Sequence, residues 1–434
     1  MRPIASALIL VLALGAVMPA AANAPDQTPP GDLLTAIDRH TAEIVPQVVA
    51  WRRDFHQHPE LGMQEVRTAR IVAEHLRSLG MEVRTGVAGT GVVGILKGGR
   101  PGRVVALRAD MDALPVTEQV DLPFRSVQKA TWNGQETGVM HACGHDTHVA
   151  MLMGAATVLA RMREELPGTV KFIFQPAEEG PGGAEPMIAA GVLRDPQVDA
   201  IFGLHVFPYT TGHVVYRAGP LMASADEFTI EITGKQTHGA VPWGGVDPVL
   251  IGAQIVTSLQ SIVSRNVNIA KAPAVVTVGK FAAGNRSNII PDRAELVGTV
   301  RAFDEEERVR IRERITAIAT QYAQAAGGSA KVTWGLGYPV TVNDPALTGR
   351  MVPALQRVAG PDKVSVGPLT GTSEDFSYFQ KQVPGMFVFL GVTPPGQEAT
   401  AAQNHSPLFY ADETALPVGV RVLANLAVEY LAGT

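Results

Sequence analysis

Short apolar segments, separated by stretches of helical periodicity, constrain this sequence more than any other feature. The segments span residues 104–107, 170–174, 201–204 and 386–390. Each is short enough for a strand and almost entirely apolar, with Lys171 as the one charged residue among them, which is typical of strands buried on both faces of a parallel sheet. The clearest helical stretch runs over 146–166, and two more, 32–58 and 64–79, precede the first segment. This alternation predicts an α/β domain with a mixed, mostly parallel sheet.

The pattern changes at about Met222, where apolar and polar residues begin to alternate as in a half-exposed strand. The order that follows is a strand around Ile230, a helix over 247–265, strands near 274–281 and 294–303, a helix capped by Asp304 and a strand over 331–336. This is the β-α-β-β-α-β order of the ferredoxin-like split unit. Because one hydrophobic core stops growing at roughly 250–300 residues, we predict two domains. The first comprises 25–221 and 338–434, and the second is an inserted α+β domain at 222–337.

The first 24 residues are expected to lie outside the fold. Arg2 precedes an apolar run over 4–17, and Ala20 and Ala22 offer a small-x-small cleavage site. The run is short for a membrane span of about 20 residues. We therefore expect a cleaved signal peptide at 1–24, export to the periplasm or the medium, and no stable membrane anchor. The formal net charge of −5 argues against a nucleic-acid partner and favours a small molecule.

Residues of metal-ligand type follow each apolar segment. They are Asp110 and Asp112, then Glu178 and Glu179, then His205, and, one loop after the last segment, His405. In open α/β sheets, ligands bind in the crevice beyond the carboxyl ends of the strands. These side chains are therefore expected to converge, although a Glu-Glu pair is usually solvated and Asp110 and Asp112 could be turn residues.

Cys143 and His145 form the densest motif, directly before a predicted helix. Cys143 is the single cysteine, so no intramolecular disulfide is available to it. A helix N-terminus favours the thiolate, which is the metal-binding form, and Cys, His and Glu together suit first-row metals. The candidate ligands are Cys143, His145, Glu179, His205 and His405. Five ligands exceed the usual number for one catalytic ion, so two divalent ions (Zn, Mn, Co or Ni) are expected.

Glu178 and Glu179 are expected to have different roles. On an extended segment their side chains would point in opposite directions, so Glu179 can bind metal while Glu178 faces the substrate side. A carboxylate beside a metal-bound water is a general base, because the metal lowers the pKa of that water. A glycine-rich fingerprint at 89–94 is rejected as a nucleotide site, since a strand and a turn follow it instead of a helix.

The motifs at 107–115, 141–146, 176–180 and 404–407 resemble those of the aminoacylase/carboxypeptidase superfamily of di-metal hydrolases. The match is closest to its amidohydrolase branch and covers essentially the whole mature chain. The resemblance places the metal ligands on the five residues above and the general base on Glu178. Asp110 stands where the superfamily usually has a histidine ligand, and Asp112 would orient a ligand.

The resemblance also implies three roles in the inserted domain. His238 is similar to a histidine that reaches the tetrahedral intermediate from the partner subunit in dimeric members, Asn288 to a substrate-binding asparagine, and Arg301 to an arginine that holds the substrate carboxylate. Imidazole and amide groups can donate to an oxyanion, and a guanidinium can grip a carboxylate. His238 and Asn288 could also be turn residues, and Arg301 a surface ion-pair partner.

We therefore predict an exported, metal-dependent hydrolase that cleaves N-acyl amino acids, with a homodimer expected through the inserted domain. A carboxypeptidase or dipeptidase with the same centre is the main alternative, because one centre can cleave both kinds of amide. A non-catalytic binding protein on the same scaffold is the alternative from another class, although a binder has no use for Glu178 as a base.

Overall fold

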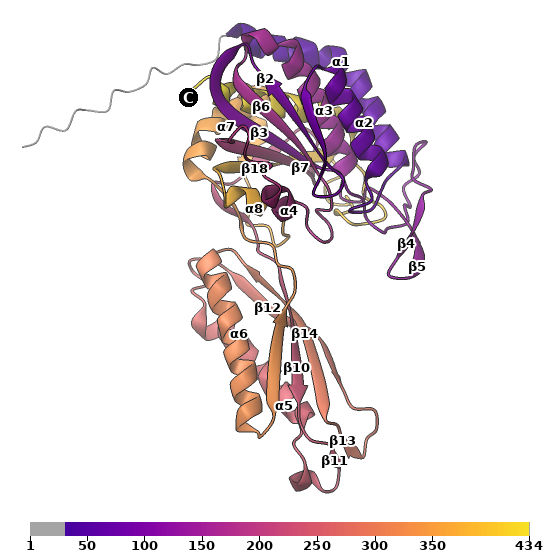
Figure 1. The fold of residues 1–434 in the computed structure, drawn as a ribbon, viewed down its shortest axis with the longest axis vertical. Helices are drawn as coiled ribbons and strands as arrows, with labels where there is room; N and C mark the ends of the chain where they lie inside the picture. Colours follow the sequence, from indigo (N-terminus) through magenta and orange to yellow (C-terminus); the bar gives the residue numbers. More distant parts are fainter. Residues whose placement is uncertain (1–30, 434) are drawn as a thin grey trace, which may run out of the picture.

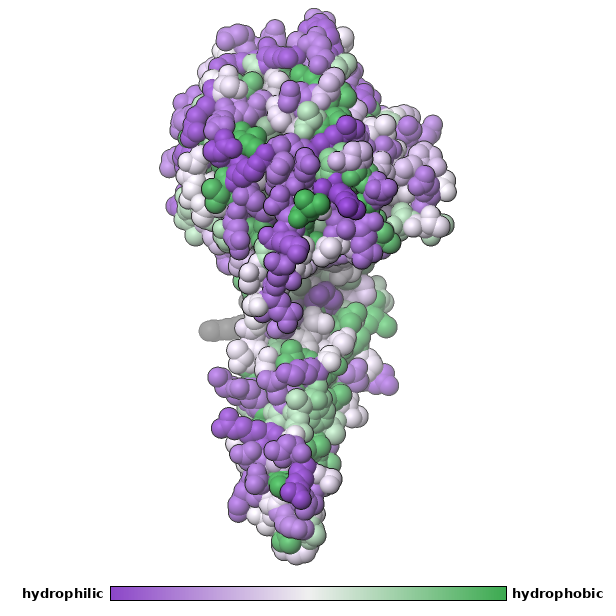
Figure 2. Space-filling view, turned by 90° about the vertical axis from the view of Figure 1, so that its right-hand side faces the viewer, coloured by the Kyte–Doolittle hydropathy of each residue, from purple (hydrophilic) through white to green (hydrophobic). Residues whose placement is uncertain are grey.

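The computed structural model describes residues 31–433. The predicted signal peptide at 1–24 lies outside these residues and stays a prediction. The chain forms a broad α/β unit, from which a narrower unit with its own sheet projects (Figure 1). In the space-filling view a waist separates the two units (Figure 2).

The α/β unit is built on an eight-stranded sheet with the order β1-β2-β6-β3-β7-β18-β8-β17. Its strands are β1 (Glu82–Val87), β2 (Gly91–Lys97), β3 (Arg100–Asp110), β6 (Pro167–Gln175), β7 (Ala200–Thr210), β8 (Val214–Tyr216), β17 (Val364–Val366) and β18 (Gly385–Thr393). The central strands β6, β3, β7 and β18 run parallel, and β1 and β2 are antiparallel additions at one edge. The predicted mixed, mostly parallel sheet is confirmed. The rejected glycine pattern runs into strand β2, so no helix follows it.

Strand register places the candidate residues side by side. Asp110 at the end of β3 pairs with Gln175 at the end of β6. Arg108 pairs with Gly203, so His205 lies level with Asp110 two residues further along β7. His205 in turn pairs with Phe389 of β18. Four neighbouring strands therefore present these side chains at one level of the sheet, as expected for strands whose carboxyl ends share an edge.

Helices cover both faces of this sheet, as a parallel sheet requires. They are α1 (Gly31–Gln57), α2 (Val66–Ser78), α3 (His145–Arg161), α4 (Ala184–Ala189), α7 (Pro345–Ala359), α8 (Phe376–Gln380) and α9 (Leu416–Leu431), with short 3₁₀ turns at Arg163–Glu165, Pro361–Lys363 and Glu413–Ala415. Helices α1, α2, α3, α7 and α9 pack on one face, and α4 and α8 on the other. Helix α3 is buried at every residue from His145 to Leu159. It ends at Arg161, earlier than predicted, because the chain tightens there into the first 3₁₀ turn.

The projecting unit contains the four-stranded antiparallel sheet β12-β14-β10-β15. Its elements are β10 (Asp226–Thr233), α5 (Pro248–Ser261), β12 (Ala274–Ala283), β14 (Arg293–Ala302), α6 (Glu305–Ala325) and β15 (Ser329–Trp334), with a 3₁₀ turn at Pro242–Gly244 and a π-helical turn at Ile262–Asn266. The β-α-β-β-α-β order matches the prediction. Strand β10 alternates buried and less buried residues, and Asp304 caps α6 by accepting a hydrogen bond from the Glu307 amide. The two helices and the sheet enclose a separate apolar core.

Small two-stranded ribbons complete the fold. They are β4 (Lys129–Trp132) with β5 (Gln135–Gly138), β9 (Gly219–Met222) with β16 (Thr341–Asn343), and β11 (Thr237–His238) with β13 (Ile289–Ile290). The two chain segments that lead into and out of the projecting unit pair at Ala225 and Tyr338. Within the described residues, the segment Glu413–Leu431 is long and apolar enough to cross a membrane, but 78% of it is buried inside the fold. It therefore serves as a core helix of the α/β unit.

Candidate metal centre

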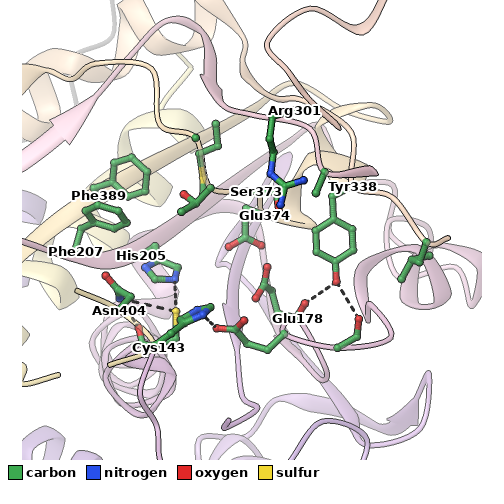
Figure 3. Close-up of a pocket in the computed structure, with 18 residues that line it drawn as sticks. Cys143, Glu178, His205, Phe207, Arg301, Tyr338, Ser373, Glu374, Phe389 and Asn404 are labelled. Carbon is green, nitrogen blue, oxygen red and sulfur yellow. Dashed lines mark hydrogen bonds and ion pairs between the residues drawn. The ribbon is translucent and has the colours of Figure 1, made fainter. Parts of the chain in front are cut away.

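A cavity of about 440 Å³ opens where the carboxyl edge of the large sheet meets the connection to the projecting unit. Figure 3 shows its lining, with Cys143 and His205 on the floor, Phe207 and Phe389 on one side, and Arg301 and Tyr338 on the other. The other lining residues are Glu178, Glu179, Gly180, Met222, Ala225, Leu336, Gly371, Thr372, Ser373, Glu374, Asn404 and His405. The cavity thus joins residues that are far apart in the sequence.

Cys143 and His145 reach the cavity from the N-terminus of α3. Gly144 between them has φ 89°, and a Cβ at this position would overlap the Val206 side chain, so only glycine fits the turn. The Cys143 Sγ lies 3.4 Å from the His205 Nε2. The His145 Nδ1 lies 3.2 Å from the Asp112 carboxylate, which leaves its Nε2 facing the cluster. Asp112 therefore lies in a position from which it could orient this imidazole, and that role stays a prediction.

The other two histidines come from separate segments. The His205 Nδ1 lies 2.7 Å from the Val206 carbonyl oxygen, which turns its Nε2 towards Cys143. The His405 Nε2 lies 2.8 Å from the Glu179 carboxylate. Asn404 holds the His405 loop in place by donating from its side-chain amide to the carbonyl oxygens of Cys143 and Val206.

Glu178 and Glu179 lie in a turn beyond β6, not in an extended segment. The prediction that their side chains point in opposite directions is therefore wrong: both carboxylates converge with His145, and the three ligand atoms lie within 4.8 Å of one another. Ala177 before them has a positive φ of 54°, which L-residues rarely adopt and which redirects the chain here. Their separate surroundings, not strand alternation, distinguish them.

The candidate ligands form overlapping groups in which all ligand atoms lie within 4.8 Å. One group is Cys143, His145 and His205, and another is Cys143, Glu179 and His405. Within the part of the chain that the structure describes, the buried Nε2 of His145 finds no hydrogen-bond partner. A buried imidazole nitrogen without a partner is costly unless it binds something. The donor set of one thiol, three imidazoles and a carboxylate fits first-row divalent metals.

The pKa values of the two adjacent carboxyl groups, Glu178 and Glu179, shift in opposite directions. Burial, followed by the charges of Glu374 and Glu179, raises the pKa of Glu178 well above its usual range. Burial also opposes ionisation of Glu179, but the hydrogen bond with His405 and the charge of His145 outweigh it and lower the pKa of Glu179. Glu179 is thus ionised, as a ligand must be, whereas Glu178 holds a proton more readily, as an acid–base group must.

Burial also acts against the charged forms of the thiol and imidazole groups. Burial, reinforced by the charge of Glu179, raises the pKa of Cys143, and burial lowers the pKa of His205, so His205 is neutral and able to ligate. Burial also acts against a charged His145, but Asp110 and Asp112 outweigh it and raise its pKa to about 10. The thiol lies among carboxylates, where a bound cation would favour its ionised form.

Beneath the cluster is a buried charge network that sequence reasoning did not single out. The Arg108 guanidinium contacts Glu374 at 2.9 Å, Asp375 at 3.0 Å and Asp110. Asp110 also lies 2.6 Å from the His148 Nδ1. Asp110 therefore supports the floor of the cavity instead of reaching into it. The acidic pair Glu374–Asp375 before α8 was the available signal, but its partner Arg108 is distant in the sequence.

Arg301 of β14 reaches the cavity from the projecting unit. It is half-buried, and one of its terminal nitrogens donates to the Thr299 hydroxyl and the Val300 carbonyl oxygen. Among residues 31–433, no carboxylate lies within 4.0 Å of its guanidinium. The geometry is therefore not that of a surface ion-pair partner.

His238 and Asn288 lie together at the far tip of the projecting unit. His238 pairs with Ile289 between β11 and β13, and Asn288 accepts a hydrogen bond from the Gly239 amide at its carbonyl oxygen. Both side chains are exposed and neither lines the cavity of its own chain. Their predicted contacts with substrate are thus not formed within one copy, and the two roles stay predictions.

Fold and site together define a two-unit α/β protein with a Cys/His/Glu cluster at the carboxyl edge of its main sheet. The chain belongs to peptidase family M20/M25/M40, which matches residues 106–429. This family membership confirms the predicted resemblance to di-metal hydrolases and identifies the chain as an enzyme that hydrolyses amide bonds.

Relatives within the family differ in what they are named for. Thermostable carboxypeptidase 2 of Saccharolobus solfataricus is 40% identical over 404 residues, which cover 92% of this chain and 99% of the relative. N-acetylcysteine deacetylase of Bacillus subtilis is 41% identical over 384 residues, which cover 88% and 96%. Among solved structures, the YXEP protein of Bacillus subtilis, a dinuclear metal-binding peptidase of the M20 family, superposes with a TM-score of 0.75 at 37% identity, covering 90% of this chain and 99% of that one.

Proposed function

We propose that this protein hydrolyses the amide bond of N-acyl amino acids with two divalent metal ions held by Cys143, His145, Glu179, His205 and His405. The two ligand groups that share Cys143 support a pair of neighbouring ions. The unpartnered Nε2 of His145 and the dinuclear site of the YXEP protein support the same assignment. When bound, such ions acidify a water molecule and polarise the carbonyl of the amide.

Glu178 is the general base and then the general acid. Its carboxylate takes a proton from the attacking water and returns it to the nitrogen of the leaving amine. The single observation that carries this role is the position of Glu178: a buried carboxyl in the cavity, within 4.8 Å of the cluster, whose pKa burial raises. A carboxyl with a raised pKa keeps the proton that it takes from the water and can deliver it to the leaving amine. Asp112 orients His145 throughout.

One side of the cavity suits the acyl group of an N-acyl amino acid, and the other side suits its carboxylate. Phe207 and Phe389 pack at a tilted angle with ring centroids 4.8 Å apart beside His205 and form an apolar wall (Figure 3). Arg301 lies on the other side and has no carboxylate partner among the described residues. This arrangement supports an apolar acyl group, such as benzoyl, against the phenyl rings and the amino-acid carboxylate on Arg301.

His238 and Asn288 act, in this proposal, from the projecting unit of a second copy in a homodimer. Two observations support it: both residues are remote from the cavity of their own chain, and the projecting unit exposes apolar side chains that include Leu250, Val275 and Phe281. Figure 2 shows apolar atoms gathered along one face of this unit. Exposed apolar faces of this kind mark association sites.

A carboxypeptidase preference is the second candidate, favoured by the 40% identity to a thermostable carboxypeptidase. Amine release from N-acetyl, N-benzoyl and indole-acetyl amino acids and from dipeptides separates the two. The protein is stripped of metal and assayed with zinc, manganese or cobalt added back. Metal-dependent release from N-acyl amino acids above that from dipeptides supports the proposal, and the reverse order supports the peptidase. No release from any substrate, in folded protein that binds two ions, would overturn both and favour a binding protein.

A further inference from the structure

We propose that Tyr338 is a positioning residue for this hydrolysis. Its hydroxyl holds the peptide unit between Glu178 and Glu179, and this peptide unit sets where both carboxylates point. The inference deepens the proposed function, because it rests on Glu178 as the base and Glu179 as a ligand. Tyr338 itself touches neither the substrate amide nor the cluster atoms in this role.

One planar peptide unit contains both the carbonyl group of Glu178 and the amide of Glu179. Tyr338 donates from its hydroxyl to the Glu178 carbonyl oxygen at 2.6 Å, as Figure 3 shows. On the other side, the Glu179 amide donates to the Asp112 carboxylate at 2.8 Å. The unit is therefore held at both ends. Its rotation would change ψ of Glu178 and φ of Glu179 together and would displace both side chains.

One backbone hydrogen bond, from the Gly182 amide to the Ala177 carbonyl oxygen at 3.1 Å, closes this turn, and side chains hold it in place. Glu65 accepts a hydrogen bond from the Ala177 amide, and Asp375 accepts from the amides of Gly183 and Ala184. These contacts hold the two ends of the segment 177–184 but do not reach the carbonyl of Glu178. Within residues 31–433, Tyr338 is the one donor that the structure gives to that carbonyl oxygen. Loss of the hydroxyl would thus remove the hydrogen bond at this end of the peptide unit, together with a longer contact of 3.5 Å to the Gly180 carbonyl oxygen.

Tyr338 is itself held on the connection to the projecting unit. Its backbone pairs with Ala225 through two hydrogen bonds, of 2.8 and 3.0 Å. Its ring packs edge-on against Tyr378, whose hydroxyl donates to the Gly337 carbonyl oxygen at 2.8 Å. The hydroxyl of Tyr338 is therefore presented by the segment that joins the two units. The orientation of Glu178 and Glu179 depends in this way on the course of that segment.

Tyr338→Phe tests the proposal, with Tyr430→Phe as the matched control, because Tyr430 lies on α9 beside Phe202 and Arg103 and not on this connection. Each variant removes one tyrosine hydroxyl, but only the first removes a donor to the Glu178–Glu179 peptide. Both are purified as full-length, metal-loaded enzyme, and kcat, KM and bound metal are measured with the best N-acyl amino acid. Hydrogen–deuterium exchange of the segment 176–184 is followed by mass spectrometry as a measurement that does not depend on activity.

The expected result for Tyr338→Phe is a kcat about three- to tenfold lower, the effect of one lost hydrogen bond, with an unchanged KM. Exchange in the segment 176–184 becomes faster, whereas Tyr430→Phe resembles the wild type in both measurements. Equal exchange of this segment in wild type and Tyr338→Phe would overturn the proposal, and so would an equal loss of kcat in both variants. If the wild-type enzyme hydrolyses no amide, the proposed function fails, and the exchange result alone decides whether Tyr338 holds this peptide.

Discussion

At the scale of single residues, the opposite pKa shifts of Glu178 and Glu179 come from the groups that surround each carboxylate. Glu179 lies beside His405 and His145, which favour its ionised form. Glu178 lies deeper, beside Glu374, and burial favours its protonated form. Two chemically identical neighbours in the sequence thus acquire opposite properties, which is the pattern expected where one carboxyl binds a cation and the other moves protons.

Arg301 provides a prediction about substrate recognition. Arg301→Gln should lower kcat/KM for an N-acyl amino acid about 10- to 100-fold, because a charge-assisted hydrogen bond to the carboxylate is lost. The corresponding N-acyl amino acid amide lacks that carboxylate, so wild type and variant should cleave it equally. Arg293→Gln, on the same strand β14 but exposed, is the control and should change neither rate. An equal loss on the acid and the amide would mean that Arg301 does not bind the carboxylate.

At the scale of elements, helix α1 holds the N-terminus of α3, the helix that begins at His145. The His56 imidazole of α1 lies between two buried carboxylates, 2.8 Å from Asp146 and 2.9 Å from Glu118. Arg52 of α1 contacts the same Asp146 oxygen at 2.9 Å. These contacts fix the start of α3 relative to the sheet and thereby the position of the metal-ligand motif.

The His56 contact predicts a pH-dependent contribution to stability. Burial acts against a charged His56, but Asp146 and Glu118 outweigh it and raise its pKa. Because the folded state then binds the proton more tightly, the stabilisation is fully present below about pH 6.5 and declines as pH rises through the raised pKa. The destabilisation caused by His56→Gln, about 1–3 kcal/mol at low pH, should therefore shrink towards pH 9. Urea unfolding of metal-free wild type and variant at each pH measures it.

The variant His75→Gln is the control for this measurement, because the pKa of His75 shifts in the direction opposite to that of His56. Burial lowers the pKa of His75, so its neutral form is the one compatible with the fold. The effect of His75→Gln should therefore stay constant between about pH 6.5 and 9. A loss for His56→Gln that stays constant or grows over this interval would contradict the account of His56.

The sequence predicted the helices and strands well, and the five candidate ligands lie close together in the structure, but the fine geometry of the cavity was not predicted. Apolar periodicity indicates buried strands directly, and parallel neighbours then bring Asp110, Gln175 and His205 to one level. The turn at Glu178 was misjudged, because Ala177 takes a left-handed conformation that its residue type does not signal. The roles of Tyr338 and Glu374 depend on contacts between distant segments, which local patterns do not encode.

At the scale of the whole molecule, the projecting unit places two predicted site residues far from the cavity of their own chain. His238 and Asn288 lie at its tip, whereas Arg301 lies at its base beside the cavity. In the proposed mechanism, one chain therefore supplies the cluster, the base and the residue that binds the substrate carboxylate. The predicted donor to the oxyanion must come from another copy if it acts as proposed.

Mixing two inactive variants tests this arrangement. In a dimer of Glu178→Gln with His238→Ala, one of the two cavities combines an intact Glu178 with an intact His238. Random exchange of subunits should then restore about a quarter of the wild-type activity, because about half of the dimers are mixed and each has one complete site. Activity that stays at the level of the separate variants, in a mixture shown to exchange subunits, would place His238 outside the catalytic site.

The central claim is that Glu178 moves the proton in a metal-dependent amide hydrolysis. The most direct test compares amine release by wild type and Glu178→Gln, each reconstituted to the same measured metal content. The account predicts that the variant stays folded, binds two ions and loses about 10²- to 10⁴-fold in kcat, since general acid–base catalysis contributes that much. Near-normal turnover by a fully metal-loaded Glu178→Gln would contradict it.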